Sequence, residues 1–466
     1  MKYRILIIAL VFIGLWSCKP ELNEFEAKSG TADFTTYVAA GNSLTAGFTD
    51  GALYKSAQEQ SYVAFLAKQF ESVGRQGTFN IPFISSEDGV GTRGPALVTK
   101  MKMGYSTDCL GNTSLAPVMA NPAASQAELF QLLSTSVAAS GPFHNLGVPG
   151  AKVTHLLAPG YGQLNPFFGR FASSPTSSVV QEIATTQPTF FTLWIGNNDV
   201  LGYAIGGGVG DVITPIEGAP GFGFAASYEA VIGSFKQTAT AGAIANIPDI
   251  TSIPYFRTVP YNPIVFAEKD SLLIQFINSQ YAAYNAGMQS VGLPYRINFS
   301  VGANPLIIQD NAMPIPDGVP LPKFRQMNND ELVLLSVPQD SLKCGGWGVA
   351  KPIPDQFILT KAEIENITNA VSSFNQVIAA AAQTHNLALV DVNAFMQQAS
   401  TTGIKLDGVT FTAAFVTGNV FSTDGIHLTP QGNAAVANFF IDAINAKYNA
   451  SVPKVIITNY SAVELP

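Results

Sequence analysis

Charged side chains are scarce in this sequence. Only 12% of its 466 residues are Asp, Glu, Lys or Arg, about half the usual fraction, whereas 47% are hydrophobic. This apolar content excludes intrinsic disorder for most of the chain and allows a large core, within a length that permits two or three domains. The net charge is −8 and no run of basic residues occurs, so the sequence lacks the basic patch on which nucleic-acid binding depends.

Cysteine and histidine are also rare, with three and four residues respectively. Cys109 and Cys344 show no metal-ligand spacing, so the sequence predicts no metal site built on cysteine. In an oxidising compartment these two residues could form a disulfide, but they lie far apart in the sequence. A disulfide and two free buried thiols therefore stand as equal alternatives.

The only long hydrophobic run lies at the N-terminus and is too short to span a bilayer. Lys2 and Arg4 precede the apolar run 5–15, which is the arrangement of a signal peptide. The next residues, Leu15-Trp-Ser-Cys18, resemble the lipobox of bacterial lipoproteins, and the alternative is an ordinary signal peptide with an incidental cysteine. We predict a signal peptide over 1–17, lipidation at Cys18, an acidic tether over 18–35, and export to the bacterial cell envelope, with a lipid anchor in the outer membrane favoured.

The remaining sequence alternates short apolar runs with amphipathic helical patterns. Residues 189–195 form a continuous apolar run, which is typical of a strand buried on both faces of a sheet. The alternation predicts an α/β protein with a parallel sheet covered by helices on both faces. Further strands are expected at 37–40, 143–147, 247–256 and 388–392, and helices at 60–70, 127–138, 179–186, 227–244, 270–288, 361–385 and 430–448.

The domain organisation follows from this alternation and its interruptions. We expect one folded body over 36–450, followed by a C-terminal tail over 451–466. Two stretches rich in Gly and Pro, at about 80–142 and 292–354, are expected to be insertions of loops and hairpins. Because long irregular connections are usually functional, the first insertion is a candidate wall of a substrate cleft.

Four loops carry distinctive polar residues, and three of them follow predicted strands. The four loops are Gly41-Asn-Ser43, 145–150, Gly196-Asn-Asn-Asp199 and Asp424-Gly-Ile-His427. Because the carboxyl ends of parallel strands lie at one edge of a sheet, we expect the three strand-end loops to meet there. A nucleophile, a base with its orienting partner, and donors for an oxyanion are the parts of an acyl-transfer site.

Each motif also has a purely structural interpretation. Ser43 can cap a helix or occupy a turn. The pair Asn198 and Asp199 can do the same, and Asp424 followed by His427 can be a surface turn.

Other polar residues offer competing assignments. Asp391 ends a predicted buried strand and is an alternative acid, although its partner histidine would lie far away in the sequence. His144 is expected to be packed beside a strand, and His155 could line the cleft. The glycine-rich run 206–211 lacks both the last glycine of a dinucleotide fingerprint and the Gly-Lys-Ser/Thr of a P-loop, so it predicts a flexible loop.

Taken together and in this order, the four motifs resemble the conserved blocks of the SGNH, or GDSL-type, hydrolases, a family of serine esterases and lipases. The resemblance implies a flavodoxin-like three-layer α/β/α fold, no metal or organic cofactor, and Ser43 as the nucleophile. His427 would be the base and Asp424 the acid. These roles agree with elementary chemistry, because a serine hydroxyl needs a base and the base needs an orienting carboxylate.

The resemblance also assigns an oxyanion hole. Gly150 lies five residues after Asn145, which is the family spacing, so it rather than Gly147 would donate a backbone N–H. The second asparagine of the Gly196–Asp199 motif, Asn198, would donate its amide. The backbone N–H of Ser43 would complete the set.

Two departures from the family bear on function. Asn42 replaces an aspartate that mainly stabilises the turn, and the chain is about twice as long as a minimal member. The expected activity is hydrolysis of carboxylic esters through an acyl-enzyme, with a small ester, an acyl lipid or an acylated glycan as substrate. The competing hypothesis is a non-catalytic lipoprotein that binds glycans or lipids on the same scaffold.

Overall fold

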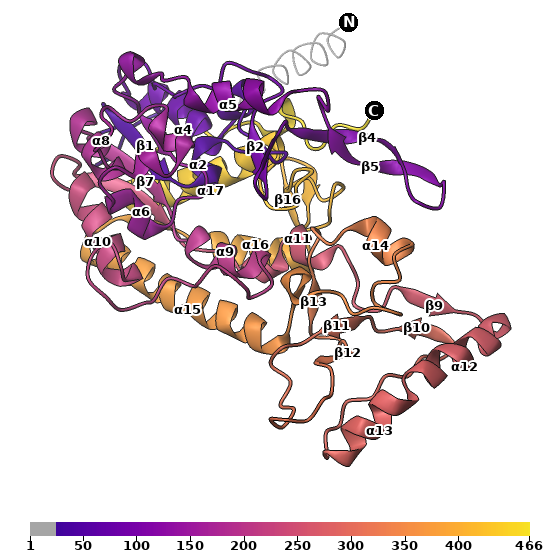
Figure 1. Ribbon diagram of the computed structural model, residues 1–466. Helices are drawn as coiled ribbons and strands as arrows, with labels where there is room; N and C mark the ends of the chain where they lie inside the picture. The colour runs from indigo at the N-terminus through magenta and orange to yellow at the C-terminus, as the bar shows by residue number, and fades with distance from the viewer. Residues whose placement is uncertain (1–24) are drawn as a thin grey trace, which may run out of the picture.

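A five-stranded parallel sheet forms the centre of the protein (Figure 1). The computed structural model describes residues 25–466, so the expected signal peptide, Cys18 and the first part of the tether lie outside the described residues. The strands lie in the order β15 (Ala388–Val390), β8 (Ala241–Ala245), β7 (Phe190–Trp194), β1 (Tyr37–Gly41) and β6 (Asn145–Gly147). Numbered along the chain this is the order 5-4-3-1-2, which is the flavodoxin-like arrangement read from the other edge. The predicted fold class is confirmed.

Side chains of β7 alternate between the two faces of the sheet and contact a different helix layer on each. Phe190 packs against Phe70 and Tyr448, with ring centroids 5.5 and 5.9 Å away. Its neighbour Phe191 points the other way and stacks on Phe235 at 4.3 Å. The first layer contains α4 (Tyr62–Phe70) and α17 (Pro430–Tyr448); the second contains α6 (Val153–Leu157), α8 (Val179–Thr186), α10 (Phe224–Phe235) and α15 (Lys361–Thr384).

The expected helix at 227–244 and strand at 247–256 were both wrong in part. The helix α10 ends at Phe235, and 241–245 form β8. Four of the five residues of this strand are Ala or Gly, and position 242 requires glycine because a Cβ there would lie 2.4 Å from the Phe191 ring. After β8, prolines interrupt the chain and leave only a 3₁₀ turn (Ile250–Ser252) and the short helix α11 (Pro254–Arg257).

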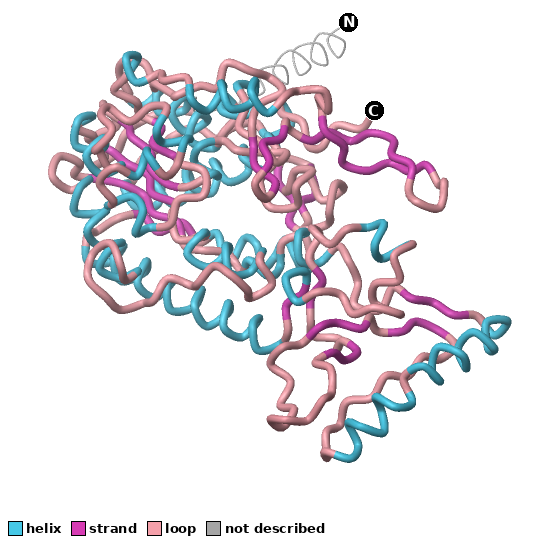
Figure 2. Tube along the Cα trace, in the orientation of Figure 1, coloured by secondary structure: helices cyan, strands magenta, loops and turns pink. Residues whose placement is uncertain are grey.

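A second region, residues 258–359, extends away from the sheet; we call it the outer region (Figure 1). It is larger than the expected insertion at 292–354, because it also includes β9 and the segment 270–288. That segment was expected to be a single helix, and the structure shows two helices there. Figure 2 shows that short strands and long loops make up most of the rest, together with the short helix at 339–343. Its elements are β9 (Ile264–Phe266), α12 (Ser271–Gln280), α13 (Ala282–Ser290), β10 (Gly302–Asn304), β11 (Ile307–Gln309), β12 (Phe324–Gln326), β13 (Leu332–Val333), α14 (Gln339–Lys343) and β14 (Ile358–Leu359).

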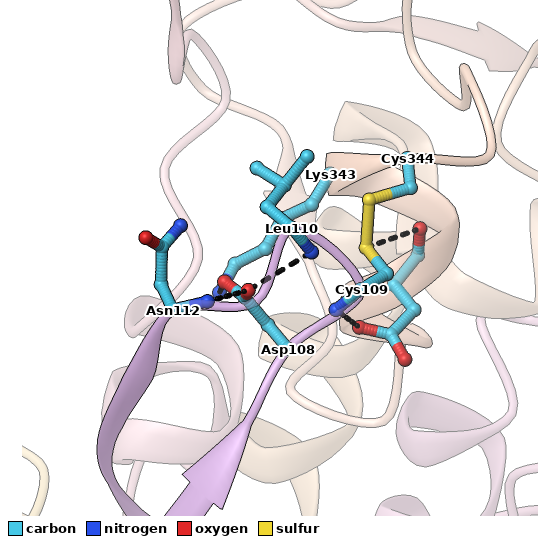
Figure 3. Close-up of a disulfide and its surroundings, with 7 residues drawn as sticks. Asp108, Cys109, Leu110, Asn112, Lys343 and Cys344 are labelled. Carbon is cyan, nitrogen blue, oxygen red and sulfur yellow. Dashed lines mark hydrogen bonds and ion pairs between the residues drawn. A yellow bond between two sulfur atoms is a disulfide. The ribbon is translucent and has the colours of Figure 1, made fainter.

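A disulfide between Cys109 and Cys344 joins the two insertions (Figure 3). Cys109 lies at the tip of the hairpin formed by β4 (Met101–Thr107) and β5 (Thr113–Met119), and Cys344 follows α14. A salt bridge of 3.0 Å between Lys343 and Asp108 lies beside it. The structure therefore decides between the two alternatives left open by the sequence in favour of the disulfide.

Short elements complete the fold between the sheet and the insertions. Residues of the tether contact the C-terminal segment, since the N–H of Ser451 donates to the carbonyl of Lys28 at 2.8 Å. Within 25–466 no helix combines the length and the apolar character needed to cross a membrane. The remaining elements are α2 (Ser43–Ala46), α3 (Lys55–Glu59), β2 (Gly91–Arg93), β3 (Ala96–Val98), α5 (Gln126–Ser134), α7 (Pro166–Gly169), α9 (Asn198–Ile205), α16 (Val392–Thr401), β16 (Ile404–Leu406) and β17 (Val409–Phe411).

Candidate active site

Ser43 begins the short helix α2, directly after β1 ends at the carboxyl edge of the sheet. The cap of this helix is Asn42, whose side-chain oxygen accepts a hydrogen bond from the N–H of Leu44 at 3.0 Å. The structural interpretation of Ser43 as the helix cap is therefore wrong. Asn42 also holds the turn, so the replacement of the family's aspartate preserves the local geometry.

A chain of hydrogen bonds connects Ser43 to His427 and Asp424. Nε2 of His427 lies 2.9 Å from Oγ of Ser43, and Nδ1 lies 2.7 Å from Oδ2 of Asp424. The side chains of His427 and Asp424 are only 13% and 12% exposed, so water competes little for these bonds. The arrangement allows the histidine to accept the serine proton while the carboxylate holds its other nitrogen.

Asp424 is held as an ionised carboxylate by its surroundings. Its Oδ1 accepts hydrogen bonds of 2.8 Å from the N–H groups of Ile426 and His427, and its Oδ2 accepts one of 2.9 Å from the N–H of Gly51. Burial alone raises the pKa of Asp424, but the nearby His427 charge and these hydrogen bonds outweigh it and hold the pKa well below its ordinary value. A carboxylate in this state can orient the imidazole and stabilise its protonated form.

Asp50 supports the same loop and was missed in the sequence. Its Oδ1 accepts a hydrogen bond of 2.8 Å from the hydroxyl of Thr423, and its Oδ2 accepts one of 2.8 Å from Tyr54. The residue has a positive φ of 53°, which presents the N–H of the following Gly51 to Asp424. The Asp-Gly pair soon after the serine motif is the signal that could have indicated this turn.

The loop that carries Gly150 is held by two adjacent residues at the start of α9. The amide of Asn198 donates to the carbonyl of Ala151 at 3.0 Å, and Oδ2 of Asp199 accepts from the N–H of Val153 at 2.9 Å. Gly150 itself has a φ of +79°, which favours glycine. Within the described part of the chain no acceptor takes the N–H of Gly150.

The neighbouring alternatives at these loops are already engaged. The N–H of Gly147 donates to the side chain of Asn145 at 3.0 Å, so it is not free to face an oxyanion. For the described residues, the N–H of Ser43 has no protein acceptor. The amide of Asn198 has a second hydrogen beyond the one used for Ala151, so it can still donate toward the serine.

Asp391, His144 and His155 each have hydrogen-bond partners other than Ser43 and His427. Asp391 caps α16 by accepting from the N–H of Ala394 at 3.0 Å, and it also accepts from Asn246 at 2.7 Å. Nδ1 of His144 accepts from the N–H of Asn80 at 3.1 Å beside a strand, as expected. Burial lowers the pKa of His155.

An apolar pocket opens beside the serine. Ser43, Asn198 and His427 form part of its wall, so two of the oxyanion candidates and the candidate base border one cavity. Most of the remaining lining is hydrophobic and comes from the segment after β8, from α16 and from the loop before α17. Sequence reasoning had not identified α16 as part of the site.

Comparisons with known proteins identify the class of this chain. The family model of GDSL-like lipases and acylhydrolases matches residues 37–440. The chain therefore belongs to this family, which confirms the resemblance stated above, and it is an enzyme of the esterase and lipase type.

Two solved structures are similar to this chain. One is LAE5, an alpha/beta hydrolase enzyme from the metagenome of Lake Arreo, Spain, at 12% identity, covering 89% of this chain and 97% of that one with a TM-score of 0.32. The other is a candidate GDSL-like lipase from Parabacteroides merdae, at 11% identity, covering 90% of this chain and 99% of that one with a TM-score of 0.33. No curated protein matches the chain.

Proposed function

We propose that this protein hydrolyses carboxylic esters through a covalent acyl-enzyme on Ser43, while anchored to the cell envelope by a lipid on Cys18. The main support for the proposed ester hydrolysis is the hydrogen-bonded chain from Ser43 through His427 to Asp424, with bonds of 2.9 and 2.7 Å. These distances are within the range in which a proton passes between a nucleophile and its base.

The proposed first half-reaction forms the acyl-enzyme. Oγ of Ser43 attacks the ester carbonyl carbon while Nε2 of His427 takes the hydroxyl proton. The negative oxygen of the tetrahedral intermediate is stabilised by the N–H groups of Ser43 and Gly150 and by the amide of Asn198. The carbon–oxygen bond to the alcohol then breaks, and His427 gives its proton to the departing oxygen.

The second half-reaction restores the enzyme. His427 removes a proton from a water molecule, which attacks the acyl carbon and breaks its bond to Oγ of Ser43. His427 returns the proton to Oγ, and the carboxylic acid leaves. Asp424 keeps the imidazole in the required tautomer and stabilises its charge in both halves.

A fluorophosphonate probe tests the catalytic part of the proposal. The chain without residues 1–18 should be labelled once, at Ser43, and should hydrolyse p-nitrophenyl acetate or butyrate. Ser43→Ala should lose the label and at least about 10⁴-fold in kcat, because a triad serine is needed for both half-reactions. If the wild-type chain takes no label and cleaves no ester, the protein is a binding lipoprotein and the catalytic proposal is wrong.

Expression of the full chain in a bacterium tests the anchor. The motif Leu15-Trp-Ser-Cys18 supports it, because a cysteine follows an apolar run and small residue. We expect mass spectrometry to find an acylated Cys18 at the mature N-terminus, and the protein to fractionate with membranes. Cys18→Ser should abolish the lipid, and an unmodified Cys18 in the wild-type chain would contradict the proposal.

A further inference from the structure

The pocket beside Ser43 is lined mainly by hydrophobic side chains, which favour an apolar group over a polar one. Its hydrophobic lining includes nine side chains that are each no more than 5% exposed, and its polar lining comes from Asn42 and Ser43, from Asn197 and Asn198 after β7, and from His427. A sugar placed there would leave hydroxyl groups without hydrogen-bond partners, which costs free energy, whereas an alkyl chain would gain from burial. The nine side chains are Trp194, Ile250, Ile253, Val392, Phe395, Met396, Phe421, Leu428 and Val436.

The pocket is small. Its cavity volume is about 50 Å³. One water molecule needs roughly 10–15 Å³ of such cavity volume, so the space corresponds to about four water molecules. That space suits a short alkyl chain. A longer chain would have to displace Phe395 or Met396, and protein interiors are packed too densely for such a displacement to be free of cost.

The chemistry of the two half-reactions indicates which part of the ester occupies this space. The alcohol leaves after the first half-reaction, whereas the acyl group stays bonded to Oγ of Ser43 until water attacks it. The group that must be held in place while His427 changes from acid to base is therefore the acyl chain. Both Ser43 and His427 border the pocket, so a chain attached to the serine can enter it directly.

We propose that this pocket binds the acyl chain of the substrate and restricts it to unbranched chains of about two to four carbons, with Phe395 and Met396 of α16 setting the limit. The substrate class is then a short-chain ester rather than a long-chain acyl lipid, and the alcohol part lies outside the pocket. This inference rests on the proposed acyl-enzyme on Ser43.

The helix α16 supplies both the test residue and its control. Met396 faces the pocket and is 3% exposed. The next residue, Gln397, is exposed and lines an open groove on the other side of the same helix. Substitutions at these adjacent positions therefore separate an effect on the pocket from a general effect on the helix.

The experiment measures kcat/KM of the full chain in detergent for p-nitrophenyl acetate, butyrate, octanoate and laurate. For the wild-type chain we expect a decrease of at least about tenfold from butyrate to octanoate, the size of effect typical of excess methylenes in a hydrophobic pocket. Met396→Ala should raise the octanoate-to-butyrate ratio by about tenfold, and Met396→Trp should lower the butyrate-to-acetate ratio by a similar factor. Gln397→Ala should change neither ratio.

The outcomes separate this inference from the proposed function. If every chain length is hydrolysed equally well, or if neither Met396 variant changes a ratio, the inference is wrong and the serine mechanism stands. If the wild-type chain hydrolyses no ester, both are wrong. Met396→Val removes less volume, so it replaces Met396→Ala if that variant unfolds, and it should shift the ratio in the same direction.

Discussion

The edge of the sheet and the outer region use polar side chains for different purposes. At the sheet edge, Ser43 and His427 lie beside an open pocket and the N–H of Gly150 has no protein acceptor among the described residues. In the outer region, the buried Arg325 donates to Asp310 at 2.7 Å and to Glu331 at 2.5 Å. The first set keeps its hydrogen-bonding capacity for a substrate, whereas the second consumes it within the protein.

The difference follows from how each region is stabilised. The five strands of the sheet lie between two helix layers, and their large apolar side chains form one continuous core. Burial of that core stabilises the body without help from its few charges. The outer region has two smaller apolar clusters, and it adds a buried ion cluster and the disulfide to Cys109. Polar substitutions should therefore cost activity in the first region and stability in the second.

Asp424→Asn should have the largest effect among these substitutions. An asparagine preserves the shape but favours the wrong imidazole tautomer, so we expect kcat to fall by about 10⁴-fold. The melting temperature should also fall, because the depressed pKa of Asp424 means that its carboxylate stabilises the folded form, but the loss of stability should be small beside the loss of activity, since asparagine keeps one oxygen to accept from the loop N–H groups. Ester hydrolysis and thermal unfolding of the same preparation check both statements. Retention of more than a tenth of the activity would show that Asp424 does not orient His427.

Arg325→Met should produce the opposite result. It leaves the buried Asp310 and Glu331 without their cationic partner, each keeping only a backbone N–H donor, and breaking a buried ion pair in this way costs about 3–5 kcal/mol. The kcat of the molecules that remain folded should be unchanged. Urea unfolding gives the free energy, and Lys454→Met is the control, because its pair with Asp442 is exposed and worth less than about 1 kcal/mol. Equal costs for both variants would contradict the comparison.

Removal of the disulfide tests how the two insertions depend on each other. Cys109→Ser with Cys344→Ser opens a link across 235 residues, and we expect a loss of about 2–4 kcal/mol. Hydrogen exchange should increase first in 101–119 and in α14, while the exchange of β1 and β7 stays the same. Increased exchange in the central strands would show that the disulfide supports the sheet as well.

Asp199→Asn tests a buried carboxyl that lies within the body. Burial raises the pKa of Asp199 to about 7, whereas the unfolded chain has an ordinary pKa near 4. Between these values the folded form binds a proton that the unfolded form does not, so the free energy of unfolding decreases as pH rises, by up to about 1.4 kcal/mol per pH unit. The variant should lack this contribution and be more stable relative to wild type at pH 8 than at pH 4. Urea unfolding across that range measures it, and identical slopes would contradict it.

Helices and strands could be predicted from the sequence where their buried residues produce a clear pattern of hydrophobic residues. The helix at 179–186 was predicted with the bounds that the structure shows, and the apolar run at 189–195 contains β7. The strand β8 was missed because four of its five residues are Ala or Gly, and only the Phe191 ring packed against Gly242 explains why that position must be glycine. Asp50 was missed because its partner Thr423 lies 373 residues away.

The sequence by itself determined which chemical groups are available and in what order: a serine after the first strand, a glycine turn, an asparagine pair, and an acid three residues before a histidine. It also determined the parallel sheet, because apolar strands alternate with amphipathic helices. Only the tertiary structure decided which groups meet. Ser43 and His427 are 384 residues apart, and they lie within hydrogen-bonding distance because α17, which follows His427, packs against α4, which follows the Ser43 turn. The pocket also forms only in the folded chain, because its walls come from segments that are far apart in the sequence.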